Sequence, residues 1–276
     1  MIKDIVVNIP PGVHDGAGVF ALSAATVFDA HVSGVIYRYL FEMPGTIMGA
    51  SAAAAVIATQ RRENEKAVAD AASAFERAAT LAGVAHDHIT PEVSLTRAPE
   101  QFGKLARTYD LAIVGQPDPD RGGPEELIVE GALFGSGRPV LVVPYTQKDA
   151  MKLDHITVCW DGSRAAARAV ADATPFLRKS KAIDVLMVQS KEAPAGEVVG
   201  ADMAQHLARN GLKVTLERLT APDLKVADAI LSYVADRGSD LLVMGGYGHS
   251  RLREFILGGV TREILSSMTL PTLMSH

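Results

Sequence analysis

The chain has little of two things that would each point to a particular kind of protein: cysteine and long apolar runs. Its single cysteine, Cys159, excludes an intrachain disulfide and a metal site built from several cysteines. Because Cys159 lies in the apolar run 156–160, we interpret it as a small packed residue and not as a nucleophile. The longest uncharged stretch, residues 43–60, is mostly alanine, serine and glycine, so it is too weakly apolar to span a bilayer comfortably.

Positive charge is too sparse for a nucleic-acid-binding surface. The chain has 27 lysines and arginines and 32 acidic residues, which gives a formal net charge of −5. Nucleic-acid-binding surfaces usually contain clusters of Lys and Arg. The only dense basic cluster, 61–62, is followed by Glu63 and Glu65 and fits a solvated helix face. The first residues, Met1–Asp4, lack the pattern of a secretory signal. We therefore expect a cytoplasmic protein that binds neither nucleic acid nor a membrane.

Signatures of catalysis and of metal binding are missing as well. There is no G-x-x-x-x-G-K-[ST] phosphate loop, and the C-terminal glycines do not follow a first strand, as a dinucleotide fingerprint requires. Ser163 and Ser250 are not in the G-x-S-x-G context of a hydrolase nucleophile, and Ser163 is expected to cap the helix that begins near Arg164. The eight histidines show no H-x-x-x-H spacing. We therefore expect no metal and no catalytic residue.

What the sequence does contain is a glycine pattern near its C-terminal end. The buried-strand pattern 240–244 runs into Gly245 and Gly248, and nine residues separate Gly248 from Gly258 and Gly259, which open a helical pattern. Glycines let backbone N–H groups approach an anion without interference from a Cβ atom. A helix N-terminus adds unpaired donors and a favourable dipole. The arrangement predicts a phosphate-binding site in the second half of the chain.

The chain also contains an internal repeat. Three segments of similar pattern occur in the same order in each half: 4–9 with 155–160, 109–115 with 239–245, and 138–144 with 270–274. Such a repeat indicates a duplicated unit of about 140 residues. We predict two domains, residues 1–146 and 153–276, joined by the polar stretch 145–153. The strands that close the halves, 140–143 and 272–274, are the expected contact in an internal pseudo-dimer; assembly into a homodimer is left open.

Each half alternates strand and helix patterns. This predicts an α/β fold of two tandem open sheets, each with five parallel strands flanked by helices. Ligands of such sheets bind beyond the carboxyl ends of the strands, where the strand order switches. In the first half, 60–83 is a strong helix pattern and 41–56 is interpreted as a loop or a poorly formed helical turn. In the second half the predicted strands lie near 155–160, 183–188, 213–218, 240–244 and 271–274, and the predicted helices near 164–178, 197–210, 223–237 and 259–268.

The combination of Asp161-Gly162-Ser163 after a first strand with Gly245, Gly248 and Gly258 resembles the universal stress protein family. Nucleotide-binding members of that family carry G-x2-G-x9-G-[ST]. The resemblance covers the whole chain as two tandem domains, and it is strong in the second half and mainly architectural in the first. It implies a Rossmann-like sheet similar to that of the adenine nucleotide alpha hydrolases. It also implies ATP or AMP as the ligand, with accompanying Mg²⁺ left open.

The resemblance assigns roles to individual residues. It implies an acid that contacts the nucleoside, an apolar residue beside adenine, a loop under the ribose and phosphates, and backbone amides that hold the phosphates. Asp161 matches the acid and Val188 the apolar residue beside adenine. The loop under the ribose and phosphates corresponds to Met244, Gly245 and Gly248. The amides that hold the phosphates correspond to Gly258, Gly259 and Val260, and Thr261 adds a hydroxyl in the same helical turn.

The second half departs from the family pattern at two positions. Gly259 stands where the pattern has Ser or Thr, which removes a hydrogen bond worth about 1.5–3 kcal/mol to a charged phosphate but keeps the N–H group. Trp160 precedes Asp161 where smaller residues are usual. Its indole would either stack on the base or fill the pocket of the base.

The first half has lost the glycine pattern. Gly115 remains, but 116–118 replaces the rest of the loop, and the stretch aligned with the second glycine cluster falls near 126–127. Pro117 has no amide donor. Four acids would repel phosphates there: Asp118, Asp120, Glu125 and Glu126. We expect no nucleotide in the first half.

Two functions of different classes remain at this point. The first is a universal stress response protein that binds ATP or AMP in its C-terminal domain and acts as a sensor or adaptor for an unknown protein partner. No general base is evident near the glycine loop, so at most slow ATP hydrolysis is left open. The second is a nucleotide-independent interaction protein. In that case the glycines serve only tight turns and close contact between helix and sheet.

Overall fold

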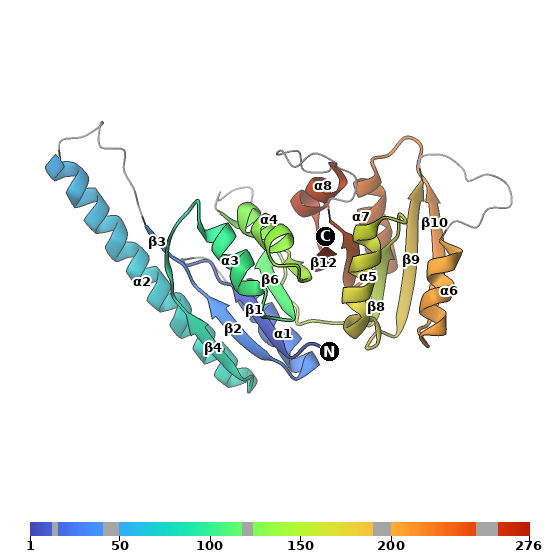
Figure 1. The fold of residues 1–276 in the computed structure, drawn as a ribbon, viewed down its shortest axis with the longest axis horizontal. Helices are drawn as coiled ribbons and strands as arrows, with labels where there is room; N and C mark the ends of the chain where they lie inside the picture. The colour runs from blue at the N-terminus through green and yellow to red at the C-terminus, as the bar shows by residue number, and fades with distance from the viewer. Residues whose placement is uncertain (13–15, 41–49, 118–123, 190–199, 247–258) are drawn as a thin grey trace.

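The computed structural model covers the whole chain and describes residues 1–12, 16–40, 50–117, 124–189, 200–246 and 259–276 (Figure 1). Strands and helices alternate through both halves. The N-terminal half contains β1 (Asp4–Asn8), α1 (Gly16–Phe28), β2 (His31–Val35), β3 (Arg38–Leu40), α2 (Ala50–Ala82), β4 (His86–Ile89), β5 (Glu92–Ser94), α3 (Ala98–Ala106), β6 (Leu111–Gly115), α4 (Glu125–Gly135) and β7 (Val140–Val143). The C-terminal half contains β8 (His155–Cys159), α5 (Arg164–Leu177), β9 (Ala182–Gln189), α6 (Ala201–Arg209), β10 (Val214–Thr220), α7 (Val226–Arg237), β11 (Leu241–Gly245), α8 (Gly259–Ser267) and β12 (Thr272–Ser275).

The main sheet joins both halves into one surface of ten strands. Its order is β10-β9-β8-β11-β12-β7-β6-β1-β2-β4. All neighbours within a half are parallel, and only β12 and β7 pair in the antiparallel sense. The prediction of two five-stranded parallel sheets flanked by helices is therefore confirmed, with the addition that the two sheets are continuous.

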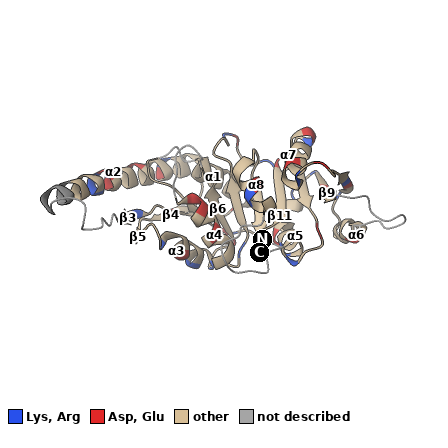
Figure 2. Cartoon of the chain, turned by 90° about the horizontal axis from the view of Figure 1, so that it is seen from above, with Lys and Arg blue, Asp and Glu red and all other residues tan. Residues whose placement is uncertain are grey.

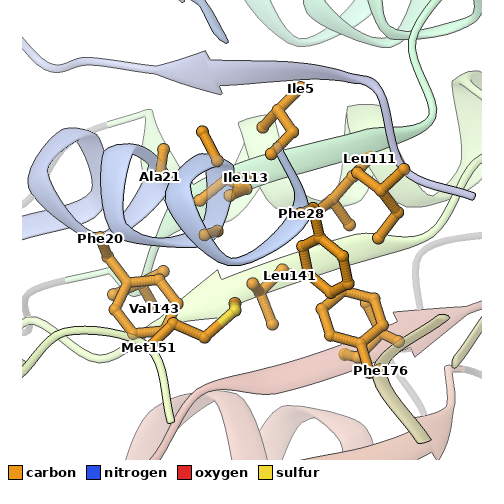
Figure 3. Close-up of a cluster of buried hydrophobic side chains, with 14 of the residues drawn as sticks. Ile5, Phe20, Ala21, Phe28, Leu111, Ile113, Leu141, Val143, Met151 and Phe176 are labelled. Atoms are coloured by element: carbon orange, nitrogen blue, oxygen red, sulfur yellow. The ribbon is translucent and has the colours of Figure 1, made fainter. Parts of the chain in front are cut away.

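The contact between the halves is the one expected from the sequence. In the β12–β7 pair, Met274 lies opposite Val140 and Thr272 opposite Val142. On one face of this seam, Phe28 of α1 meets Phe176 of α5 edge to face, with ring centroids 4.9 Å apart (Figure 3). Both rings belong to a hydrophobic cluster that runs across the two halves without interruption. The halves therefore share a core and do not meet through strand edges alone.

Helices cover both faces of the sheet (Figure 2). The cluster that contains Phe28 and Phe176 is formed with α1, α2, α5 and α6, and we call this side of the sheet the α1/α5 face. A second cluster is formed with α3, α4, α7 and α8 on the other side, the α4/α8 face. Continuous burial of strands such as β7 and β11, which are covered on both sides, explains why their sequences are apolar without alternation.

Helix α2 differs from the sequence-based expectation. It begins at Ala50, so residues 50–56 are helical and not the predicted loop, while 41–49 lie outside the described residues. The helix has 33 residues, a length of about 50 Å, and extends past the body of the protein (Figure 2). Its exposed side carries the i,i+4 pair Arg61–Glu65, with Nε and Oε1 3.2 Å apart, as expected of a solvated helix face. None of the described helices is both long and apolar enough to cross a membrane.

Candidate functional site

The strand order switches between β8 and β11, and the region beyond the carboxyl ends of these two strands is called the crevice. The chain leaves β8 through α5 toward β9 on one side, and it reaches β11 on the other side of β8. This reversal is the topological switch point at which ligands of open parallel sheets bind, beyond the carboxyl ends of the strands. Here those ends are Cys159 of β8 and Gly245 of β11. The sequence-predicted site residues follow these ends directly.

Asp161 lies in a tight turn that starts α5. Its Oδ1 accepts a hydrogen bond of 2.9 Å from the Ser163 N–H, and Gly162 between them has φ +74°, a conformation that favours glycine. Ser163 Oγ accepts from the Ala166 N–H at 3.1 Å, so the predicted N-cap is confirmed. The turn holds the exposed Asp161 carboxylate at the mouth of the crevice.

Three apolar site residues lie on one face of the sheet. Val188 near the end of β9, Met244 in β11 and Val260 in α8 all pack against the cluster on the α4/α8 face. Val188 and Val260 stay half-buried, while Met244 is buried. The structure therefore places Val188, predicted to lie beside the base, on the same face of the sheet as Met244 and Val260, which were predicted to lie near the ribose and phosphates.

The Trp160 indole does not lie on this side. It packs against the cluster on the α1/α5 face, whereas its neighbour Cys159 packs with the α4/α8 face. Burial, together with the smaller effect of the negative charge of Asp161, raises the pKa of the Cys159 thiol to about 12. Cys159 is thus an unreactive packed thiol, and the Trp160 indole packs on the face of the sheet opposite to Val188.

Gly245 is required by packing against backbone, and Gly246 lies close against one side chain. A Cβ on Gly245 would lie 2.5 Å from the Ala166 nitrogen at the start of α5. A Cβ on Gly246 would lie 2.7 Å from Leu133 Cδ2 in α4 of the other half. Both distances are shorter than real Cβ contacts, so the close approach of two helices accounts for these glycines without any ligand.

The start of α8 is different, because Gly259 has no such neighbour. No described atom would lie within 4 Å of a Cβ at Gly259, and the residue is exposed. The first N–H groups of a helix have no intrahelical partner. Thr261, in the same first turn, is buried with Ile264 and Leu265 on the packed side of α8.

The remaining two predicted glycines, Gly248 and Gly258, lie outside the described residues. The described part of the site therefore consists of Asp161, Val188, Met244, Gly245, Gly259, Val260 and Thr261. No group of three or more His, Cys, Asp or Glu residues that could hold a metal ion occurs among the residues described.

The equivalent place in the N-terminal half is built from different residues. The pairing of Asn8 with Val35 matches that of Cys159 with Leu186, so Tyr37 occupies the position of Val188. Tyr37 is fully buried. By the same registers Pro10 stands in place of Asp161 and Gln116 in place of Gly246.

Helix α4 also starts differently from α8. It begins with two acids, Glu125 and Glu126, after Pro124, which makes no side-chain cap. Negative side chains at a helix N-terminus already satisfy the helix dipole and repel an incoming anion. Gln116 in turn is tied down, because its Nε2 donates to the Leu265 carbonyl at 2.8 Å and its Oε1 accepts from the Tyr145 N–H at 3.3 Å.

Comparison with known proteins locates the family of the second half. The model of the universal stress protein family matches residues 152–276. One universal stress protein domain is present there. The curated Universal stress protein Slr1230 of Synechocystis sp. (strain ATCC 27184 / PCC 6803 / Kazusa) is 26% identical over 138 residues, which cover 49% of this chain and 46% of that protein. The match thus spans about half the length of this curated relative.

Solved structures extend the likeness of fold to the whole chain. A universal stress protein from Archaeoglobus fulgidus DSM 4304 superposes with a TM-score of 0.69 over 98% of this chain and 95% of its own, at 16% identity. A putative universal stress protein from Pseudomonas aeruginosa UCBPP-PA14 gives a TM-score of 0.60 over 99% and 93%, also at 16% identity. At such identities the likeness concerns the fold. The second tandem domain in residues 1–146 stays a prediction.

Sequence reasoning missed one neighbour of the site, the C-terminal end of α4. Leu133 touches Gly246, and the Phe134 ring meets the His276 ring edge to face at 4.9 Å. The repeat could have indicated it, since antiparallel pairing of the two closing strands places the beginning of β7 beside the end of β12.

Proposed function

We propose that the C-terminal half binds one adenine nucleotide, ATP or AMP, at the crevice between β8 and β11, and that the protein acts as a nucleotide-dependent sensor or adaptor in a cytoplasmic stress response. The observation that carries this proposal is the contrast between the two halves. The same fold offers Asp161, Val188 and Gly259 at one switch point, and Pro10, Tyr37 and an acidic helix start at the other.

The described residues fit an adenine nucleotide in three respects. The half-buried Val188 and Val260 provide apolar surface for a flat base on the α4/α8 face. The carboxylate of Asp161 accepts hydrogen bonds from ribose hydroxyls or base amino groups. The open start of α8 presents backbone donors and the positive end of a helix dipole to phosphates. Mg²⁺ would accompany the triphosphate through phosphate oxygens.

The rival function, a nucleotide-independent interaction protein, is favoured by the packing of Gly245 and Gly246. Both glycines have a purely structural explanation in the contacts with Ala166 and Leu133. The glycine pattern by itself therefore does not distinguish the two functions. At Gly259 no described atom would lie within 4 Å of a Cβ, so contacts among the described residues do not explain this glycine of the predicted site.

A direct test transfers the N-terminal residue into the C-terminal site. Tyr37 fills the equivalent position in the N-terminal half. Val188→Tyr introduces the same side chain in the C-terminal half, at the place where the base would bind. A matched control, Val19→Tyr, makes the same change at a 55% exposed position of α1. The measurement is the melting temperature with and without millimolar Mg-ATP, since ligand at 100 times its dissociation constant stabilises by about 2.7 kcal/mol.

We expect ATP to raise the melting temperature of the wild type and of Val19→Tyr, and not that of Val188→Tyr. No shift for the wild type, together with no nucleotide released on denaturation, would favour the nucleotide-independent function. A full shift for Val188→Tyr would place the base elsewhere.

A further inference from the structure

The segment that follows β11 is held from three directions before it enters the proposed site. The Gly246 N–H donates to the Ser275 carbonyl at 2.8 Å. The Gly246 carbonyl accepts from His276 Nδ1 at 3.1 Å, which fixes the tautomer with the proton on Nδ1. The Cα of Gly246 faces Leu133 of α4 so closely that a Cβ there would meet Leu133 Cδ2 at 2.7 Å.

Two of these three restraints depend on α4 of the other half. Leu133 contacts Gly246 directly. Phe134 acts through His276, because its ring packs edge to face on the imidazole at 4.9 Å with an interplanar angle of 77°. The chain of contacts therefore runs from α4 through Phe134 and His276 to the carbonyl of Gly246. We call Leu133, Phe134, His276 and Gly246 the seam latch.

The residue after β6 in the N-terminal half makes the corresponding contact with the C-terminal half. Gln116, which stands in place of Gly246, donates from Nε2 to the carbonyl of Leu265 in α8 at 2.8 Å. Leu265 is in turn the counterpart of Leu133, since Pro271 matches Pro139 at the start of the following strands. In the N-terminal half this contact is a polar bond to a side chain. In the C-terminal half the contact is made by the backbone of Gly246, so a shift of α4 would act directly on the main chain at the end of β11.

We propose that α4 of the N-terminal half regulates the nucleotide site of the C-terminal half, with Leu133 and Phe134 as positioning residues that hold Gly246 at the carboxyl end of β11. This inference rests on the proposed function. It gives the N-terminal half a role that needs no ligand of its own. Because coupling between sites is reciprocal, a nucleotide bound beside α8 stabilises the latch, and a partner that moves α4 changes nucleotide affinity.

The position of Phe134 makes the test feasible. Its side chain is 52% exposed, so its truncation is compatible with folding, whereas Leu133 is buried and its truncation risks the core. Leu127, 50% exposed near the other end of α4, provides a matched control. The variants are Phe134→Ala, Leu127→Ala and Phe134→Tyr, the last of which keeps an aromatic ring against His276.

Two readouts separate the failure of this inference from failure of the proposed function. The first is amide hydrogen exchange of residues 245–262 without nucleotide, and the second is the dissociation constant for Mg-ATP. Loss of an aromatic pair predicts a change of about two- to tenfold in each for Phe134→Ala, with wild-type behaviour for Leu127→Ala and Phe134→Tyr.

Unchanged exchange and unchanged affinity in Phe134→Ala would overturn the role of α4 while leaving nucleotide binding intact. Faster exchange confined to this segment in a protein that binds no ATP would support the positioning role and refute the proposed ligand. Loss of protection from hydrogen exchange over the whole chain in Phe134→Ala, or an equal loss of protection in Leu127→Ala, would show an effect on general stability. Either result would also overturn the inference.

Discussion

Replacement of Gly259 by aspartate separates the stability of the fold from the binding of an anion. Gly259 is the first residue of α8, is exposed, and has open space around the position of a Cβ. Its φ is not among the positive values that favour glycine. An aspartate there gains about 0.3–1 kcal/mol from the helix dipole and removes the entropic cost of glycine in a helix. The unliganded protein is therefore expected to melt at the wild-type temperature or above.

The same aspartate opposes a nucleotide. A phosphate charge held by the amides of the first turn would lie about 6 Å from the new carboxylate, where the Coulomb energy between unit charges is about 0.7 kcal/mol in water and about 3 kcal/mol at an effective dielectric constant of 20. We expect the affinity for ATP to fall by about three- to 100-fold. The fall should shrink as ionic strength increases, because salt screens the repulsion.

The assay is a calorimetric titration of Mg-ATP into Gly259→Asp and into the neutral control Gly259→Asn, with melting curves of both proteins. The asparagine variant has nearly the same shape without the charge, so it should stay within about twofold of the wild type. Equal affinities of the two variants, with both folded, would show that no phosphate lies at the start of α8 and would refute the reasoning.

Two further predictions concern the scaffold around the site. Ser163→Ala removes the cap on the Ala166 N–H and should lower the free energy of unfolding by about 0.5–2 kcal/mol in a urea titration, and Ser163→Asp should restore it. Asp184 is buried among Tyr233 and Arg237, with Oδ2 2.7 Å from the Tyr233 hydroxyl and 2.9 Å from Arg237 Nε. Burial opposes its charge, but these hydrogen bonds outweigh burial and lower its pKa. A lowered pKa contributes stability that is complete above the unfolded value of about 3.9 and is lost as the pH falls through the folded value. Asp184→Ala should therefore cost about 1.5–3 kcal/mol at neutral pH and flatten the acid limb of a pH–stability curve; a cost below 1 kcal/mol would contradict this account.

The architecture could be predicted because it is encoded in local patterns that occur twice. The matching segments 4–9 and 155–160 predicted corresponding first strands, and the structure places them at the same position of two parallel sheets. The contact of 140–143 with 272–274 was expected from the same repeat and is confirmed, and the structure adds that the two strands are antiparallel. The Ser163 cap followed from residue type and position alone.

The parts that could not be predicted depend on contacts between distant segments. A sequence shows that a residue is glycine but not whether the space is taken by a neighbouring helix or by a ligand. The sequence therefore could not show that Gly245 faces Ala166 and that Gly246 faces Leu133. The equivalence of Tyr37 with Val188 needed strand register. The early start of α2 was missed because its alanine-rich first turns follow Pro44, Gly45 and Gly49, which suggested a loop.

The side of the sheet on which Trp160 lies also required the structure. Successive side chains of a strand point to opposite faces of the sheet. Val158 and Trp160, which follows β8, pack on the α1/α5 face, and Cys159 packs on the α4/α8 face. Residue type alone left the indole as either a stacking platform or an obstacle. Its observed packing removes it from the side of Val188 and so leaves that side to a ligand.

The central claim, one nucleotide site in the C-terminal half and none in the N-terminal half, is tested most directly by the stoichiometry of ATP binding. Equilibrium dialysis of the purified chain against labelled Mg-ATP up to millimolar concentration measures the number of molecules bound per chain. We predict saturation at one ATP per chain, lost in Val188→Tyr. Saturation at two would contradict the assignment of Tyr37 and Gln116 as residues that close the first site, and no binding at any concentration would contradict the nucleotide site itself.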